Sequence, residues 1–147
     1  MDFSIITGNI GLYLEGAWLT FQLLILSLAV GLGLAIPMAI MRISKNPLYS
    51  TFVRFFVYIF RGTPLLVQIY IIYYGFGQFD VIKESFLWTF FKEAYFCCLF
   101  AFALNTAAYT IEILRGAMVA TPFGEIEAAK AYGMSRALIL SRIILPR

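Results

Sequence analysis

Histidine is absent from the chain, and cysteine occurs only as the adjacent pair Cys97 and Cys98. The absence of imidazole removes the commonest general base and metal ligand of proteins. Neighbouring side chains alternate around a helix, so the two cysteines suit packing in an apolar run rather than a disulfide framework or a metal site. With no serine–histidine or metal-ligand constellation, the sequence argues against a membrane-embedded hydrolase and predicts neither a catalytic site nor a bound metal.

Charge is also scarce. Charged residues make up 13% of the 147 residues and leave a net charge of +3, whereas 62% of the residues are hydrophobic and 18% are aromatic. This composition, with a mean hydropathy of +0.88, is typical of a membrane protein. No basic cluster with interleaved aromatics indicates a nucleic-acid partner, and no glycine-rich phosphate loop is present, so a nucleotide would have to bind to another subunit.

Long apolar runs predict an all-α membrane protein with three transmembrane helices that contact lipid. The run Ala17–Met41 carries no charge and is long enough to span with some tilt. The second run contains Arg61-Gly62-Thr63-Pro64, which predicts a bent helix with its arginine paired or near an interface. The approximate spans are 17–41, 52–77 and 94–119, followed by a loop over 120–146.

The distribution of basic residues predicts the topology. Arg42, Lys45 and Arg54 surround a turn without any acidic residue, which places this turn in the cytoplasm and the N-terminus in the periplasm. The mixed charges of residues 78–93 fit the outer side, and the basic segment after the third span fits the inner side. Residues 1–16 have no lysine or arginine, so we expect no cleaved secretory signal.

The last segment is polar and helix-forming in an otherwise apolar chain. Its alanine, glutamate and lysine residues predict a short helix over 122–132, with Thr121 as the N-cap and Pro122 at the first helical position. Gly133 fits a left-handed stop, and Ser135 is placed to cap a second helix that Pro146 closes. We expect two short helices with a kink, exposed beside the membrane.

Within this segment, Glu127-Ala128-Ala129 is followed after three residues by Gly133, and after nine more by Ile143, one residue and Leu145-Pro146. This motif and its spacing resemble the signature loop of bacterial ABC importer permeases. The resemblance implies a cytoplasmic coupling helix that docks into a groove of an ATPase subunit. From the residues alone, small side chains would let a helix enter a crevice and Glu127 would offer one charge, although a solvated connecting helix is the alternative. The ATPase-coupling residues that the resemblance implies are Glu127, Ala128, Ala129, Gly133, Ile143, Leu145 and Pro146.

Two further segments, residues 60–68 and 104–117, resemble the polar amino-acid uptake branch of these permeases. The similarity is to permeases for histidine, lysine, arginine, ornithine and opines. It implies an importer for amino acids, basic ones in particular, in the bacterial inner membrane. The implied partners are a second permease subunit, a pair of ABC ATPase subunits that hold ATP and magnesium, and a periplasmic amino-acid-binding protein. The permease itself would carry no cofactor.

Candidate residues for the substrate pathway are Asn105, Tyr109, Glu112 and Arg61. The first three lie at spacings of four and three residues, so they share one helix face. An intramembrane carboxylate is a functional-site hypothesis by default. Glu112 either faces the pathway and balances a positive charge on the substrate, or pairs with Arg61 or Arg115 and holds the helices together. Arg61 either contacts substrate or extends to the interface beside a structural kink.

Members of the resembled family continue past the Leu-Pro of the signature loop with two further spans. We therefore expect residues 1–147 to form a C-terminally truncated part of a five-span permease domain. Two other function classes remain open. An ion-coupled secondary transporter would use Glu112 and Arg61 as coupling charges, although no internal repeat is visible. A small membrane scaffold would carry no solute at all.

Overall fold

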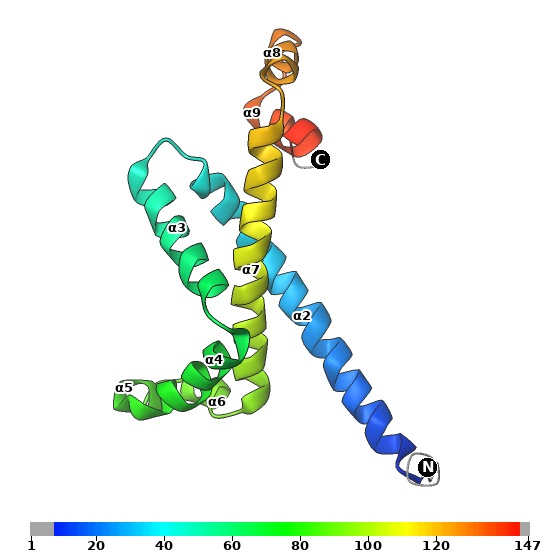
Figure 1. The fold of residues 1–147 in the computed structure, drawn as a ribbon, viewed down its shortest axis with the longest axis vertical. Helices are drawn as coiled ribbons and strands as arrows, with labels where there is room; N and C mark the ends of the chain where they lie inside the picture. The colour runs from blue at the N-terminus through cyan, green and yellow to red at the C-terminus, as the bar shows by residue number, and fades with distance from the viewer. Residues whose placement is uncertain (1–7, 145–147) are drawn as a thin grey trace. The chain divides into compact units, whose positions relative to one another are not determined.

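The computed structural model describes residues 8–144, and its regular structure over that range is helical (Figure 1). This confirms the prediction of an all-α protein, whose long apolar runs satisfy their own backbone hydrogen bonds. The elements are α2 (Ile10–Arg42), α3 (Pro47–Gly62), α4 (Leu65–Tyr70), η1 (Ile71–Gly75), η2 (Phe76–Gln78), α5 (Asp80–Lys83), α6 (Trp88–Phe91), α7 (Ala94–Ala120), α8 (Phe123–Ala131), α9 (Arg136–Ile139) and η3 (Leu140–Ile144). The predicted roles of Leu145 and Pro146 lie outside the described residues.

Within that range, α2 and α7 are each long and apolar enough to cross a membrane as one unbroken helix. Figure 1 shows both as continuous helices. A third candidate span arises if α3 and the helical segment that follows it are counted together. The expected first span is thus extended at its N-terminal end, and the third span agrees closely with α7. That these segments cross the membrane stays a prediction.

The second expected span, 52–77, is interrupted at Thr63 and Pro64. Proline disfavours helical geometry in the residue before it, and Thr63 is extended, with φ −113° and ψ 142°. The amide and hydroxyl of Thr63 both donate to the Ile59 carbonyl, at 3.1 and 2.8 Å, so the end of α3 is capped. The glycine and proline that predicted a bent helix therefore produce a complete break, beyond which α4 passes into the π-helix η1.

The described residues form two compact units. The first unit contains the residues up to Gly31 together with Pro64–Thr106. Its core cluster comprises Ile72, Cys97 and Ala101. The Cys97 thiol donates to the Phe91 carbonyl at 3.2 Å and is buried, so the prediction that the cysteines serve packing is confirmed for this residue.

A close approach between α2 and α7 occurs inside the first unit. A Cβ atom added at Gly31 would lie 2.8 Å from the Thr106 Cβ and 3.0 Å from the Ala103 carbonyl oxygen. Side chains do not approach that closely, so this contact requires glycine. At Gly33, by contrast, an added Cβ would meet nothing within 4 Å.

The second unit contains Leu32–Thr63 and the described residues from Ala107 onward. Its core joins α2, α3 and α7 through small and branched side chains, and η3 packs against it through Leu140 and Ile144. α3 begins at Pro47 with Asn46 as its N-cap, because the Leu48 amide donates to Asn46 Oδ1 at 3.0 Å. The buried core residues are Ala35, Ala39, Val53, Val57, Ile111 and Met118.

The start of α8 differs from the prediction. Pro122, in an extended conformation, is the N-cap, and the helix begins at Phe123. The prediction of Thr121 as the N-cap is wrong because its hydroxyl donates instead to the Ala117 carbonyl at 3.1 Å, within the last turn of α7. Threonine hydroxyls make this bond to the preceding turn when they end a helix rather than begin one.

The end of α8 follows the prediction. Gly133 has φ +76°, the left-handed conformation that favours glycine. The Met134 amide donates to the Ala129 carbonyl at 3.0 Å, and the Gly133 amide donates to the Lys130 carbonyl at 2.9 Å. These two bonds define a Schellman motif. Ser135 then caps α9, as predicted, by accepting from the Leu138 amide at 3.4 Å.

Candidate functional site

A charged cavity of 430 Å³ lies inside the second unit, between α3 and the parts of α2 and α7 that belong to this unit. It contains three of the four residues predicted for the substrate pathway: Arg61, Tyr109 and Glu112. Its volume lies within the range of about 300–1,000 Å³ that small-molecule sites occupy. The lining residues are Arg42, Arg54, Val57, Tyr58, Arg61, Gly62, Tyr109 and Glu112.

Glu112 holds two guanidinium groups. Arg42 Nε donates to Glu112 Oε1 at 3.2 Å, and Arg115 Nε donates to Glu112 Oε2 at 2.6 Å. The Arg42 and Glu112 side chains are each 17% exposed, so this ion pair is largely shielded from solvent. Its hydrogen bond joins two charged groups and is therefore stronger than a bond between neutral groups. The predicted pairing of Glu112 with Arg115 is confirmed.

Arg61 does not share the Glu112 carboxylate in the described part of the chain. Its guanidinium carbon lies 5.0 Å from the centroid of the Tyr109 ring, which is a cation–π contact. Arg61 sits in the last turn of α3, where the helix dipole favours a cation. The alternative in which Glu112 pairs with Arg61 is therefore wrong for the described residues, because Arg42 and Arg115 occupy the Glu112 carboxylate and Arg61 contacts the ring of Tyr109.

The cavity carries more positive than negative charge. Three arginines line it against one glutamate, which leaves two positive charges in excess. Among the described residues Arg54 makes no ion pair, and Arg54 and Arg61 are both exposed. Unpaired cations of this kind within a membrane protein usually face a water-filled path.

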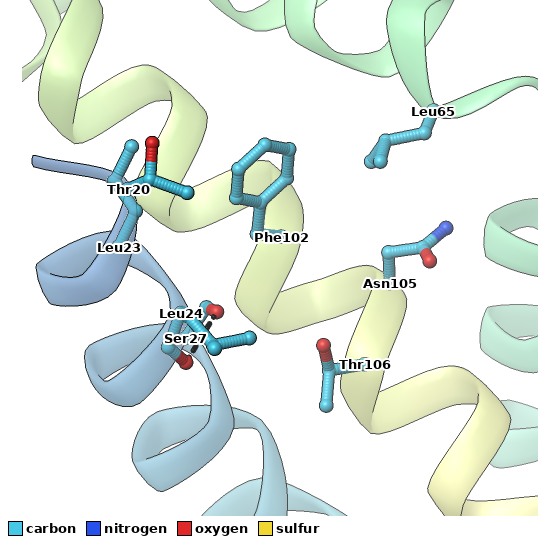
Figure 2. A pocket seen from close by; sticks show the side chains of 8 residues that line it. All are labelled: Thr20, Leu23, Leu24, Ser27, Leu65, Phe102, Asn105 and Thr106. Carbon is cyan, nitrogen blue, oxygen red and sulfur yellow. Dashed lines mark hydrogen bonds between the residues drawn. The ribbon is translucent and has the colours of Figure 1, made fainter. Parts of the chain in front are cut away.

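Asn105 lies in the first unit and lines a different cavity, of 470 Å³ (Figure 2). Hydroxyl and amide groups from Thr20, Ser27, Asn105 and Thr106 line it together with apolar side chains. Figure 2 shows the hydrogen bond from the Ser27 hydroxyl to the Leu24 carbonyl, which measures 3.1 Å. This cavity therefore offers hydrogen-bonding groups without charge. The structure does not bring Asn105 into the charged cavity of the second unit, which we call the arginine cavity because Arg42, Arg54 and Arg61 line it.

The predicted ATPase-coupling segment presents one continuous exposed face on α8. Gly124, Glu127, Ala128 and Ala131 are all exposed and lie at helical spacings of three and four residues. Ala129 is buried at 4% exposure, so it does not belong to this face. Gly133 is exposed at the kink, and Ile143 is half-buried in η3.

Sequence reasoning missed two charged residues that line the cavity of the second unit, Arg42 and Arg54. Arg42 and Arg54 were interpreted as loop charges that set the topology, and no short-range pattern links Arg42 to a carboxylate 70 residues away. One signal was available. Arg54 falls inside an expected span, and a charge at that position is a candidate for a functional site in its own right.

The arrangement of helices is that of an ABC transporter permease. The crystal structure of an amino acid ABC transporter with histidines is similar to this chain with a TM-score of 0.81 and 29% sequence identity. The similarity covers 99% of this chain and 64% of the solved chain. The predicted fold class is thereby confirmed.

The chain belongs to the family of binding-protein-dependent transport system inner membrane components, whose model matches residues 31–147. Similar proteins include the octopine transport system permease of Rhizobium meliloti, at 52% identity over 91% of this chain. The nopaline transport system permease of Agrobacterium fabrum is 46% identical over 99% of it. The histidine/lysine/arginine/ornithine transport system permease of Escherichia coli is 44% identical over 92%. The predicted resemblance to polar amino-acid permeases is confirmed.

The chain spans little more than half the length of these curated relatives. It covers 55% of the octopine permease, 61% of the nopaline permease and 58% of the histidine/lysine/arginine/ornithine permease. The family and the apolar helices together fit a multi-pass protein of the inner membrane.

Proposed function

We propose that this chain forms part of the transmembrane permease subunit of a binding-protein-dependent ABC importer for amino acids, with basic amino acids or opines as its substrates. The family supports the importer class, and the substrate class rests on relatives named for octopine, nopaline and basic amino-acid transport. The subunit does no bond chemistry of its own. ATP and Mg²⁺ bind to a separate pair of ATPase subunits.

The observation that carries the proposal is the exposed face of α8. Gly124, Ala128 and Ala131 give it a flat surface that permits close approach to a groove, and Glu127 supplies one charge. Phe123 and Tyr132 flank the face at the two ends of the helix and are 84% and 88% exposed. Large exposed aromatic residues are unusual on a solvated connecting helix and are common anchors in protein interfaces.

The ends of α8 support this role because they make it a rigid unit. The Schellman motif at Gly133 fixes the C-terminal end, and η3 packs Ile144 onto the core of the second unit. A force on α8 would therefore reach α3 and α7 through packed side chains. In the proposed cycle, ATP binding closes the ATPase pair, draws the coupling helices of two permease subunits together, and opens the pathway toward a periplasmic binding protein.

The same proposal includes a topology. The basic turn that contains Lys45 and the segment α8–η3 lie in the cytoplasm, and the N-terminus lies in the periplasm. The lack of acidic residues beside Arg42 and Lys45 supports this orientation through the positive-inside rule.

Uptake by the purified system tests the proposal. The complete permease that contains this chain, with its second permease and its ATPase, is reconstituted in vesicles, and uptake of radiolabelled arginine is measured with the binding protein outside. We expect uptake that requires both ATP inside the vesicle and the binding protein. Uptake driven by an ion gradient without ATP would support the secondary transporter instead, and a complex without flux would support a scaffold.

A matched pair of substitutions locates the coupling face. Glu127→Gln removes the charge from the exposed face, and we expect the ATP-driven uptake to fall by about tenfold, as for the loss of one charge-assisted hydrogen bond. Glu125→Gln makes the same chemical change on the same helix but away from that face, and uptake should stay near the unmodified value. Equal losses in both variants would contradict a specific role for this face.

A further inference from the structure

The charged cavity of the second unit has a sign opposite to the one that a basic substrate side chain would select. Among the described residues Glu112 is the single acidic residue that lines it, and two guanidinium groups already balance its charge. A cationic ligand group would have to displace Arg42 or Arg115, at the cost of leaving an arginine unpaired. Glu112 thus orders Arg42 and Arg115 and does not select for cations.

Arg54 and Arg61 line the cavity and pair with no carboxylate of the described chain, so their guanidinium groups can bind an anion. They are seven residues apart on α3, so they lie two turns apart on the same side of the helix. The Arg61 guanidinium carbon lies over the Tyr109 ring, 5.0 Å from its centroid, and this contact restrains a group that carries five N–H donors. Planar guanidinium groups match the geometry of a carboxylate.

We propose that Arg54 and Arg61, together with Arg42 in the same cavity, form a subsite for the carboxylate of the transported solute. The inference rests on the proposed function, because it takes the solute to be an amino acid, which always carries a carboxylate. A carboxylate fits better than a phosphate, since Glu112 contributes a negative charge that would repel a dianion more strongly. The subsite recognises the part that all amino acids share, so it does not distinguish basic side chains from others.

The sign of the local potential can be measured through Tyr58, which lines the cavity and is 77% exposed. Tyr58→Cys is introduced in the complete importer after Cys97→Ser and Cys98→Ser, and the protein is placed in phosphatidylcholine nanodiscs. The cysteine is treated with methanethiosulfonate reagents of negative and of positive charge. We expect faster modification by the anionic reagent, because clefts lined by one sign of charge concentrate the opposite ion.

Arginine substitutions then identify the source of the potential. Arg54→Gln together with Arg61→Gln should lower the ratio of anionic to cationic modification rates by about tenfold. Each arginine is also changed to glutamine alone, and Lys45→Gln is the control that removes one positive charge from the same basic region. Lys45 does not line the cavity, so with Lys45→Gln the ratio should stay unchanged. A ratio that is insensitive to the arginines, or lowered equally by Lys45→Gln, would overturn the inference.

Protection from modification identifies the ligand. Arginine should slow the modification of Tyr58→Cys, whereas argininamide, which has the same side chain without the carboxylate, should not. The Arg61→Gln substitution should abolish the protection by arginine. Equal protection by arginine and argininamide would overturn the carboxylate assignment. Protection that depends on phosphatidylglycerol and not on arginine would assign the site to a lipid headgroup and would also overturn it.

ATP-driven uptake of radiolabelled arginine is measured on the same preparation. If uptake is present and arginine gives no protection, the subsite is wrong while the proposed function stands. If no amino acid is taken up by the unmodified complex, the proposed function fails, and the charge-selective rates still report whether the cavity attracts anions.

Discussion

The two compact units hold parts of the same two long helices by different means. In the first unit, α2 and α7 meet through Gly31, and the cavity there is lined by hydroxyl, amide and apolar groups. In the second unit, Glu112 joins Arg42 on α2 to Arg115 on α7, beside a cavity rich in arginine. In the described part of the first unit the ion pair is Lys83–Asp80, which lies instead on the exposed surface.

This contrast shows how a sequence with few charges uses them. A close contact between backbones needs no charge, since the absence of a side chain is enough. Partly buried arginines, however, need a carboxylate to hold them, and Glu112 provides it for two. Substitutions at each place should affect one unit and spare the other.

The largest effect is expected from Glu112→Gln. The neutral amide cannot balance two guanidinium groups, and we expect a loss of roughly 3 kcal/mol in the free energy of unfolding, as when one partner of a shielded ion pair is removed. Thermal unfolding in detergent measures the loss, and hydrogen exchange should rise in residues 32–42 and 107–120. Glu127→Gln, on the exposed face of α8, is the matched control.

An unchanged melting temperature for Glu112→Gln would mean that the apolar cluster around Ile111 alone stabilises the second unit. Faster exchange confined to residues 64–106 would equally contradict the contrast between the units.

Gly31→Ala tests the first unit. The new Cβ would lie 2.8 Å from Thr106, and we expect overpacking to destabilise the protein by roughly 2 kcal/mol. Gly33→Ala, two residues further along α2, meets nothing within 4 Å and should raise stability slightly, because alanine is the better helix former. Hydrogen exchange should increase near Thr106 for the first variant alone; similar behaviour of both variants would argue against a close helix contact at Gly31.

Gly133→Ala addresses the rigid end of α8. A side chain in the left-handed region costs about 1 kcal/mol, so the Schellman motif should loosen and amide exchange at Met134 should accelerate. Gly133→Asn should have a smaller effect, since asparagine tolerates this conformation better. If alanine and asparagine gave the same exchange rates as glycine, backbone conformation at this kink would not limit the rigidity of α8.

Tyr109→Leu should have the smallest effect. It removes the ring beneath Arg61 and with it a contact worth about 0.5–1 kcal/mol. Tyr109→Phe keeps the ring and serves as the control. Thermal unfolding of the two variants should differ by that amount, and the difference should shrink when Arg61→Gln is present. A difference that persists without Arg61 would show that the ring acts through packing instead.

The sequence allowed the long elements and a bend in the second expected span to be predicted, because their causes are local, whereas the complete interruption of that span at Thr63 and Pro64 was not expected. Uncharged runs define α2 and α7, Pro64 breaks the second expected span, and Gly133 ends α8. The pairing of Arg42 with Glu112 could not be predicted, since 70 residues separate them and several arginines were equally eligible.

The sequence also did not show which of two similar neighbouring residues caps α8 or is buried in it. Thr121 and Pro122 both suit a helix start, and the Thr121 hydroxyl donates back to the Ala117 carbonyl of α7 instead of capping α8. Ala128 and Ala129 are chemically identical neighbours, yet one is exposed and the other is buried. Only the rotation of α8 within the unit distinguishes them, and this rotation depends on tertiary packing.

That difference provides the most direct test of the account. In the background of Cys97→Ser and Cys98→Ser, Ala128→Cys and Ala129→Cys are compared in the assembled importer, with single cysteines along the groove of the ATPase. The account predicts a cross-link from Ala128→Cys whose yield changes on ATP binding, and little or none from Ala129→Cys. Two results would contradict the claim that α8 couples this permease to an ATPase. One is no cross-link from Ala128→Cys in a stable, assembled complex, and the other is a cross-link whose yield does not change when ATP is added.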